Sequence, residues 1–120
     1  MTYDTTNIFA RILRNEIPAQ KHYEDEILIV IEDIAPAAPV HLLFIPKGEY
    51  VSFDDFAQKA TPEAQAHFFG AIARVAQQRQ LQESGYRLIT NHGVDGAQSV
   101  PHFHVHLLGG KAMGALLAEG

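Results

Sequence analysis

Short apolar runs separated by turn-forming residues recur along this 120-residue chain. Runs of this length, bounded by Pro, Gly, Asn or Asp, are typical of β-strands. On this pattern we expect strands over residues 21–23, 27–31, 41–45, 86–91 and 101–108. Because these runs are joined by hairpin-length links and helical segments, we expect an α+β fold. Its sheet should be mainly antiparallel, with the helices on one side.

Two segments carry the apolar period of a helix. The first covers residues 8–13 and stops near Pro18. The second begins at residues 61–63, Thr-Pro-Glu, which supply an N-cap, a proline at the first helical position and an acidic side chain for the helix dipole. We expect this long helix to reach about Glu83, with Gly85 as its stop signal.

The long helix has two apolar faces, whereas a helix lying on a sheet needs only one. One stripe contains Ala64, Phe68, Ala71, Ile72 and Val75, and a second on nearly the opposite face contains Ala66, Phe69, Gly70 and Ala73. The second stripe could be covered by loops of the same chain. We favour a symmetric homodimer formed through this helix.

The last apolar run, residues 102–108, alternates imidazole and apolar side chains as His-Phe-His-Val-His-Leu-Leu. In a strand, alternate residues share one face, so His102, His104 and His106 should line up together. Histidine titrates near neutral pH, with an unperturbed pKa of about 6.5. This run is therefore the first candidate for a catalytic site.

Two other interpretations of the histidines remain open. A solvent-facing strand could carry them without any function. A metal site is the other, but His102 and His106 would lie about 13 Å apart along a strand, too far for all three histidines to bind one ion. His41 or His92 could instead complete a two-histidine site. We expect no metal.

Composition narrows the class of protein. The chain is 47% hydrophobic and 19% charged, as in an ordinary globular protein, and we expect one domain over residues 1–120. The sequence contains no apolar stretch of membrane-spanning length, and its start lacks the pattern of a signal segment. A net charge of −5 argues against sequence-independent nucleic-acid binding. The absence of cysteine excludes disulfides, and we expect a cytoplasmic protein.

The loop before the histidines carries a second signal. Gly93 and Gly96 allow tight turns that expose backbone N–H groups, and Gln98 and Ser99 add neutral donors. Such a loop suits an anion, and beside a histidine cluster it suits a phosphate.

With these residues in view, the chain resembles the histidine triad (HIT) proteins, whose signature is His-x-His-x-His-x-x with apolar x. Residues 102–108 fit it at every position. The likeness covers roughly residues 7 to 113 and is specific to the HINT branch, the purine nucleoside phosphoramidases. It includes the segments 7–12, 16–19, 33–41, 45–47, 91–93, 95–96, 98–100 and 109–110.

The resemblance implies a HIT-like fold with a five-stranded sheet, one short helix and one long helix. Two protomers would join their sheets into a continuous ten-stranded sheet. It also implies binding of purine nucleoside monophosphates. The implied reaction is hydrolysis of the P–N bond of nucleoside 5′-phosphoramidates such as those of adenosine, through a nucleotidyl-histidine intermediate and without a cofactor.

Carried onto this chain, the resemblance makes His104 the nucleophile. Its other ring nitrogen should donate to a fixed acceptor, which we expect to be a backbone group. The remaining roles are binding the phosphoryl oxygens (His106), orienting and polarising the cluster (His102 and His41), passing a proton to the leaving nitrogen (Ser99), and holding the phosphate or leaving group (Asn91 and Gln98).

The resemblance also implies a nucleotide pocket. Asp33 would accept hydrogen bonds from the ribose hydroxyls. An apolar slot for the base would be lined by Ile8, Phe9, Ile12, Ile31, Ile34 and Leu43. Each of these apolar residues, taken without the resemblance, would be assigned to an ordinary core.

Three features depart from the family pattern: Ala97, where a second glycine is common, Pro101, where many members have an aromatic residue, and the C-terminal segment 111–117. Ala97 could shift the backbone amides that face the phosphate, and the different C-terminal segment leaves the preferred leaving group undecided. Two other functions stay open: a nucleotide-binding regulatory or partner-binding module with incidental catalysis, and a metal-dependent enzyme.

Overall fold

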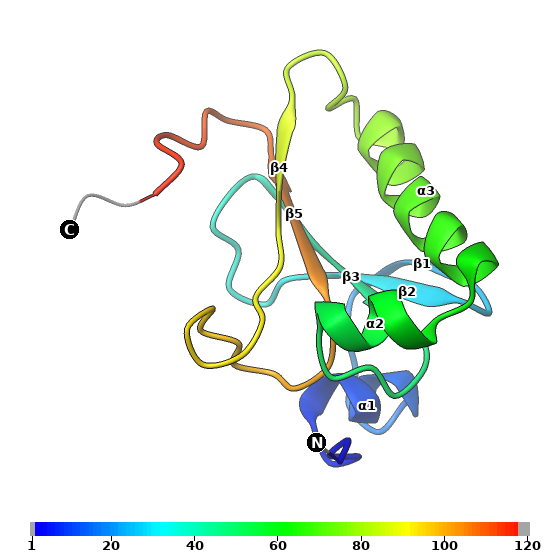
Figure 1. The fold of residues 1–120 in the computed structure, drawn as a ribbon. Helices are drawn as coiled ribbons and strands as arrows, with labels where there is room; N and C mark the ends of the chain where they lie inside the picture. The colour runs from blue at the N-terminus through cyan, green and yellow to red at the C-terminus, as the bar shows by residue number, and fades with distance from the viewer. Residues whose placement is uncertain (1, 118–120) are drawn as a thin grey trace.

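The computed structural model describes residues 2–117 and contains a five-stranded antiparallel sheet with helices packed against it (Figure 1). The strand order is β1-β2-β3-β5-β4. The strands are β1 (Lys21–Glu24), β2 (Leu28–Glu32), β3 (Val40–Pro46), β4 (Tyr86–Ile89) and β5 (Val105–Gly109). The helices are α1 (Ile8–Leu13), α2 (Phe53–Lys59) and α3 (Pro62–Gln78). The predicted α+β class and antiparallel sheet are therefore confirmed.

The sheet is buried on both faces, because alternate residues of its central strands enter different cores. Leu42 and Phe44 of β3 pack with α2 and α3, whereas Leu43 and Ile45 pack with α1. The expectation that all helices lie on one side was wrong. A strand buried on both faces has too few polar positions to show which face a short helix covers.

Two helices also differ from the prediction. We did not predict α2, although Ser52 stands at its N-cap position and two acidic residues lie in its first turn. The helix α3 ends at Gln78, before the predicted Glu83. Its end is formed by Gln80 in the left-handed region, at φ 60°, where a glycine would have been the recognisable signal.

The last strand begins at Val105, four residues later than predicted. Pro101 has no N–H to offer a neighbouring strand. The N–H of Phe103 donates to the carbonyl of Tyr50, and the hydroxyl of Thr90 donates to the carbonyl of His104. His102, in a bend where its N–H donates to the carbonyl of Val100, and His104 therefore lie in the segment that leads into β5, and only His106 lies within the strand.

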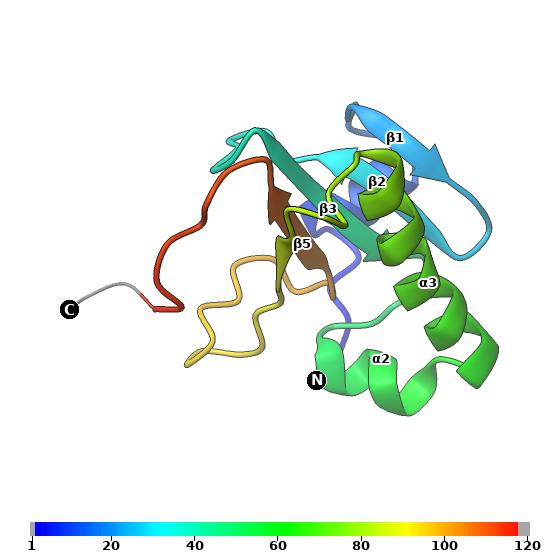
Figure 2. The ribbon, with the colours of Figure 1, turned by 90° about the horizontal axis from the view of Figure 1, so that it is seen from above.

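The second apolar stripe of α3 is exposed in the monomer, with Phe69 at 43% exposure, whereas the first stripe is largely buried. At one edge of the sheet, β4 also exposes apolar side chains, including Leu88 and Ile89. The loops of residues 33–39 and 91–99 lie on the side of the molecule away from α3 in both views (Figures 1 and 2). Within residues 2–117, none of the helices has the length and apolar character needed to cross a bilayer.

Candidate active site

A cavity of about 540 Å³ opens on the face of the sheet that carries α1. Its volume lies in the range of small-molecule sites. The six apolar residues predicted for the base slot all line it: Ile8, Phe9, Ile12, Ile31, Ile34 and Leu43. Asp33, the predicted ribose acid, lines it as well. The structure therefore gathers these side chains from α1, β2, β3 and the loop after β2 into one apolar cavity with an acidic edge.

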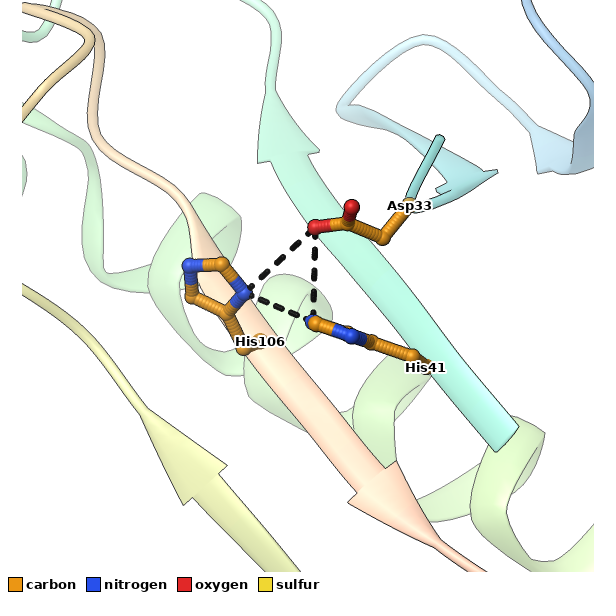
Figure 3. A group of neighbouring side chains, drawn as sticks. All are labelled: Asp33, His41 and His106. Carbon is orange, nitrogen blue, oxygen red and sulfur yellow. Dashed lines mark hydrogen bonds and ion pairs between the residues drawn. The ribbon is translucent and has the colours of Figure 1, made fainter. Parts of the chain in front are cut away.

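Three polar side chains converge beside this cavity (Figure 3). His41 lies on β3, His106 lies on the adjacent strand β5, and Asp33 follows β2. His41 Nε2 is 2.9 Å from His106 Nδ1 and 3.4 Å from Asp33 Oδ2. The pairing of His106 with Leu43, two residues from His41, puts both rings on one face.

The hydrogen bonds around these rings determine where the protons lie. The N–H of Ala37 donates to His41 Nδ1, so neutral His41 carries its proton on Nε2. That proton is donated to His106 Nδ1, 2.9 Å away. His106, when neutral, then carries its own proton on Nε2. Its free edge therefore presents an N–H, which suits a phosphoryl oxygen.

His104 has the opposite polarity. Its Nδ1 is 2.8 Å from the carbonyl oxygen of His102, and a carbonyl can only accept, so Nδ1 carries the proton. This is the backbone acceptor expected from the sequence. Nε2 of neutral His104 consequently keeps its lone pair. The ring lies between Phe9, at 4.8 Å between centroids, and His106, at 5.1 Å.

His102, the first histidine of the run, is wholly buried. Its Nε2 is 2.9 Å from the carbonyl oxygen of Pro46, and its Nδ1 is 2.6 Å from the hydroxyl of Tyr3. Its contact with the cluster is made through its backbone carbonyl to His104. The three rings therefore do not share one strand face as predicted: those of His104 and His106 lie next to Phe9 and Asp33, which line the cavity, and that of His102 lies in the core.

Burial keeps all three rings neutral at pH 7. Loss of solvation lowers the pKa of His102 to about 4 and lowers that of His104 below its usual range. Burial, and to a smaller extent repulsion from the nearby His104 and His41, lowers the pKa of His106 to about 4. A neutral imidazole with a free lone pair is the form that can act as a nucleophile.

The cluster of Asp33, His41 and His106 has the spacing of a metal site but not its surroundings. The three ligand atoms lie within 4.8 Å of one another, and zinc bonds of about 2.0–2.1 Å would place them about 3.4 Å apart. A metal-bound histidine normally donates its second N–H to an acceptor. Here a backbone donor, the N–H of Ala37, faces that position on His41. The surroundings favour a hydrogen-bonded pair of histidines.

The loop of residues 91–99 is held by its own side chains. Gln98 Nε2 donates to the carbonyls of Val51 and Val100, at 2.6 and 3.0 Å, and its Oε1 accepts from the N–H of Gly93. Asn91 donates to the carbonyl of Gly96 at 2.6 Å. These bonds hold the loop in shape, and contact of either amide with a phosphate stays a prediction.

Ser99 is exposed on the segment that leads from this loop to His102, and its predicted role is untested. His92, which the sequence offered as a second metal candidate, is not part of the cluster of Asp33, His41 and His106, and its Nδ1 is 3.6 Å from Asp54 Oδ1.

Several lining residues were not predicted. The cavity wall also includes Ile17, Pro18, Ala19, Gln20, Glu32 and Pro36. Most of them lie in the connections before β1 and after β2, where their side chains follow no period that could have indicated a wall. The hydrogen bond from Tyr3 to His102 had no signal in the sequence, because the two residues are 99 positions apart.

Known proteins match this sequence over most of its length. Residues 14–113 match the family model of the HIT domain. An uncharacterized HIT-like protein from Azospirillum brasilense is 46% identical over 119 residues, covering 99% of this chain and 98% of that protein. The purine nucleoside phosphoramidase of Escherichia coli K12 is 39% identical over 112 residues, covering 93% of each chain.

Solved structures show the same fold. A HIT family hydrolase from Legionella pneumophila superposes with a TM-score of 0.85 at 38% identity, covering 91% of this chain and 96% of that one. A HIT family hydrolase from Clostridium thermocellum gives a TM-score of 0.81 at 40% identity, covering 94% and 97%.

The loop of residues 91–99 yields a stability prediction. Ala97 is held in the left-handed region at φ 56°, which costs a residue with a side chain about 1–2 kcal/mol. Ala97→Gly should therefore raise the free energy of unfolding by about 1 kcal/mol. The greater conformational entropy of glycine in the unfolded chain offsets part of this gain. Gly96→Ala should lower it, because the new Cβ would lie 2.4 Å from the carbonyl oxygen of His92. Urea denaturation of both variants checks the pair, and equal effects would contradict it.

The buried histidines predict how stability depends on pH. In the folded protein the pKa values of His102 and His106 are about 4, whereas unfolded histidine titrates near about 6.5. Between these values the unfolded chain binds more protons, so stability should be full above about pH 6.5 and fall as the pH drops towards 4. Urea denaturation from pH 7.5 to 4.5 measures this. The decline should be shallower in His104→Ala, and a flat wild-type profile would contradict the burial of neutral rings.

Proposed function

The chain belongs to the HIT domain family, and on that premise we propose that it hydrolyses the P–N bond of purine nucleoside 5′-phosphoramidates. The observation that carries the proposal is a pair of adjacent neutral imidazoles with opposite polarity. His104 offers a lone pair and His106 offers an N–H, 5.1 Å apart between ring centroids, beside a cavity of nucleotide size. Relatives that bear the name hydrolase support the reaction class.

The substrate would lie with its base in the apolar cavity and its phosphate at the histidines. The purine would enter the apolar end, against Phe9 and Leu43, and the ribose hydroxyls would donate to Asp33. Asp33 Oδ1 already accepts from the N–H of Ala35, so Oδ2 is the oxygen turned towards the histidines and available to a sugar. This placement brings the α-phosphate to His104 and His106.

His104 would begin the reaction. Its Nε2 lone pair attacks the α-phosphorus, the P–N bond breaks, and the nucleotidyl group is transferred to His104. The departing nitrogen takes a proton as it leaves, because an amide anion is a poor leaving group, and we assign that proton to the Ser99 hydroxyl. Water then attacks the phosphorus and returns a proton to Ser99, the bond from phosphorus to His104 breaks, and nucleoside monophosphate, free His104 and the Ser99 hydroxyl are formed.

The other groups would stabilise charge during transfer. The His106 N–H donates to the phosphoryl oxygens as negative charge grows on them. When Nε2 of His104 bonds to phosphorus, the ring becomes cationic, and the carbonyl of His102 is already placed to accept from its Nδ1–H. The carboxylate of Asp33 favours the positive charge of that ring as well. Nucleophilic attack therefore needs no rearrangement of these groups.

The nucleophile assignment predicts a separation of binding from turnover. His104→Ala should lower turnover of an adenosine 5′-phosphoramidate by at least about 10³-fold, since the covalent step is lost. Adenosine monophosphate should still bind within a few-fold, because the cavity and Asp33 remain. His92→Ala, an exposed histidine outside the cluster, is the control and should keep wild-type rates.

The assay is done with and without a chelator, with calorimetry for binding. Turnover that chelator abolishes and zinc restores would make the protein a metal-dependent enzyme. Wild-type binding without any turnover would make it a binding module. Loss of binding equal to the loss of turnover in His104→Ala would remove the nucleophile assignment.

We also propose that the protein is a homodimer through α3 and the edge strand β4. The support is the stripe of Ala66, Phe69 and Ala73, exposed on the monomer, and the exposed apolar side chains of β4. An edge strand with free backbone groups can add a strand of a second copy, as a ten-stranded sheet requires.

The dimer has a matched test. Phe69 and Phe53 are 43% and 44% exposed, but only Phe69 lies on the second stripe of α3. Phe69→Asp should therefore shift the protein to monomer in sedimentation experiments, whereas Phe53→Asp should leave the dimer intact. A wild-type monomer at micromolar concentration, or dissociation by both substitutions, would contradict this interface.

A further inference from the structure

Tyr3 lies in the segment before α1 and reaches the buried end of the histidine cluster. Its hydroxyl is 2.6 Å from Nδ1 of His102, and the two rings meet edge to face at 5.6 Å between centroids. On the far side of His102, Nε2 faces the carbonyl of Pro46 at 2.9 Å. A carbonyl only accepts, so the His102 proton lies on Nε2 and Nδ1 must accept from Tyr3.

The residue that accepts this hydrogen bond, His102, is itself bonded to the proposed nucleophile, His104. The backbone carbonyl of His102 accepts the Nδ1–H of His104 at 2.8 Å. Phe9 packs edge to face against both imidazoles, at 6.3 Å from His102 and 4.8 Å from His104. A change in the position of His102 is therefore passed to His104 through its backbone and through the shared contact with Phe9.

We propose that Tyr3 is a positioning residue for His104: its hydroxyl holds His102 in one orientation and one tautomer, and the carbonyl of His102 in turn holds the His104 lone pair towards the cavity. The role of His104 in this statement rests on the proposed function. The Tyr3 hydroxyl can keep this bond over the working pH range, because burial raises its pKa above the usual value. Without the hydroxyl, Nδ1 of a fully buried ring would have no donor, and the ring could turn.

The test compares two hydroxyl deletions. Tyr3→Phe keeps the ring and removes the donor to His102. Tyr23→Phe is the control: its hydroxyl also donates to a side chain, Asp25 at 2.5 Å, but on strand β1 at the other edge of the sheet from β4. For an adenosine 5′-phosphoramidate we expect kcat to fall about tenfold in Tyr3→Phe with KM within about twofold, since geometry is lost and the cavity is not. Tyr23→Phe should match the wild type.

Nitrogen NMR of the histidine rings supplies a readout that does not depend on turnover. In the wild type, His102 should be protonated on Nε2 and His104 on Nδ1. In Tyr3→Phe the ring signals of both should shift, whereas in Tyr23→Phe they should not. Unchanged His104 signals together with an unchanged kcat would overturn the proposal.

The two readouts separate this proposal from the proposed function. If the wild type does not cleave the phosphoramidate, the proposed function fails, and the ring spectra still decide whether Tyr3 positions His104. If Tyr3→Phe does not fold, the wild-type spectrum decides: His102 protonated on Nδ1 would exclude donation by Tyr3, and protonation on Nε2 would support it.

Discussion

The chemistry of this site depends on one hydrogen bond, from Nδ1 of His104 to the carbonyl of His102. A neutral imidazole has one donor and one acceptor, so engaging Nδ1 as the donor leaves Nε2 as the free lone pair. The segment that makes this bond is not yet a strand, because β5 begins only at Val105. His102 and His104 can therefore direct their rings differently: that of His102 is wholly buried in the core, and that of His104 packs between His106 and Phe9, which lines the cavity. A regular strand from Pro101 would have placed all the rings on one surface and provided no such acceptor.

Burial and hydrogen bonding act together in this cluster. Loss of solvation disfavours the charged forms of His102 and His104 and outweighs the hydrogen bonds that favour their protonation, so the pKa values of both rings are lowered. The backbone N–H of Ala37 then sets the direction of the chain of donors that runs from His41 to His106. Because this series of hydrogen bonds begins with the N–H of Ala37 as donor, each ring accepts on Nδ1 and carries its proton on Nε2. The free edge of His106 therefore presents an N–H. The N–H of Ala37 also disfavours a metal at the cluster, because a metal-bound His41 would need an acceptor at that position. This one backbone group therefore favours a hydrogen-bonded histidine pair over a metal site of similar spacing.

Much of the fold follows from the sequence because apolar alternation and capping residues act locally. The runs that became β2 and β3, the Thr-Pro-Glu start of α3 and the buried stripe of that helix were all readable. The apolar slot followed from the family resemblance, and the structure brings its six residues together. What failed depends on distant contacts. The side of the sheet that α1 covers, the late start of β5 and the burial of His102 are decided by partners such as Tyr50, Pro46 and Tyr3, far away along the chain. The predicted roles of Ser99, Asn91 and Gln98 still await experiment.

The central claim is that His104 carries the nucleotidyl group during turnover. The most direct measurement is to mix the protein with an adenosine 5′-phosphoramidate, quench within the first turnovers at alkaline pH, and locate any added nucleotidyl mass by peptide sequencing in a mass spectrometer. The account predicts an adenylyl group on the peptide containing residues 102–108, bound to His104, that forms and decays at the rate of turnover. An adduct on His106, or steady turnover with no adduct on any histidine, would contradict it.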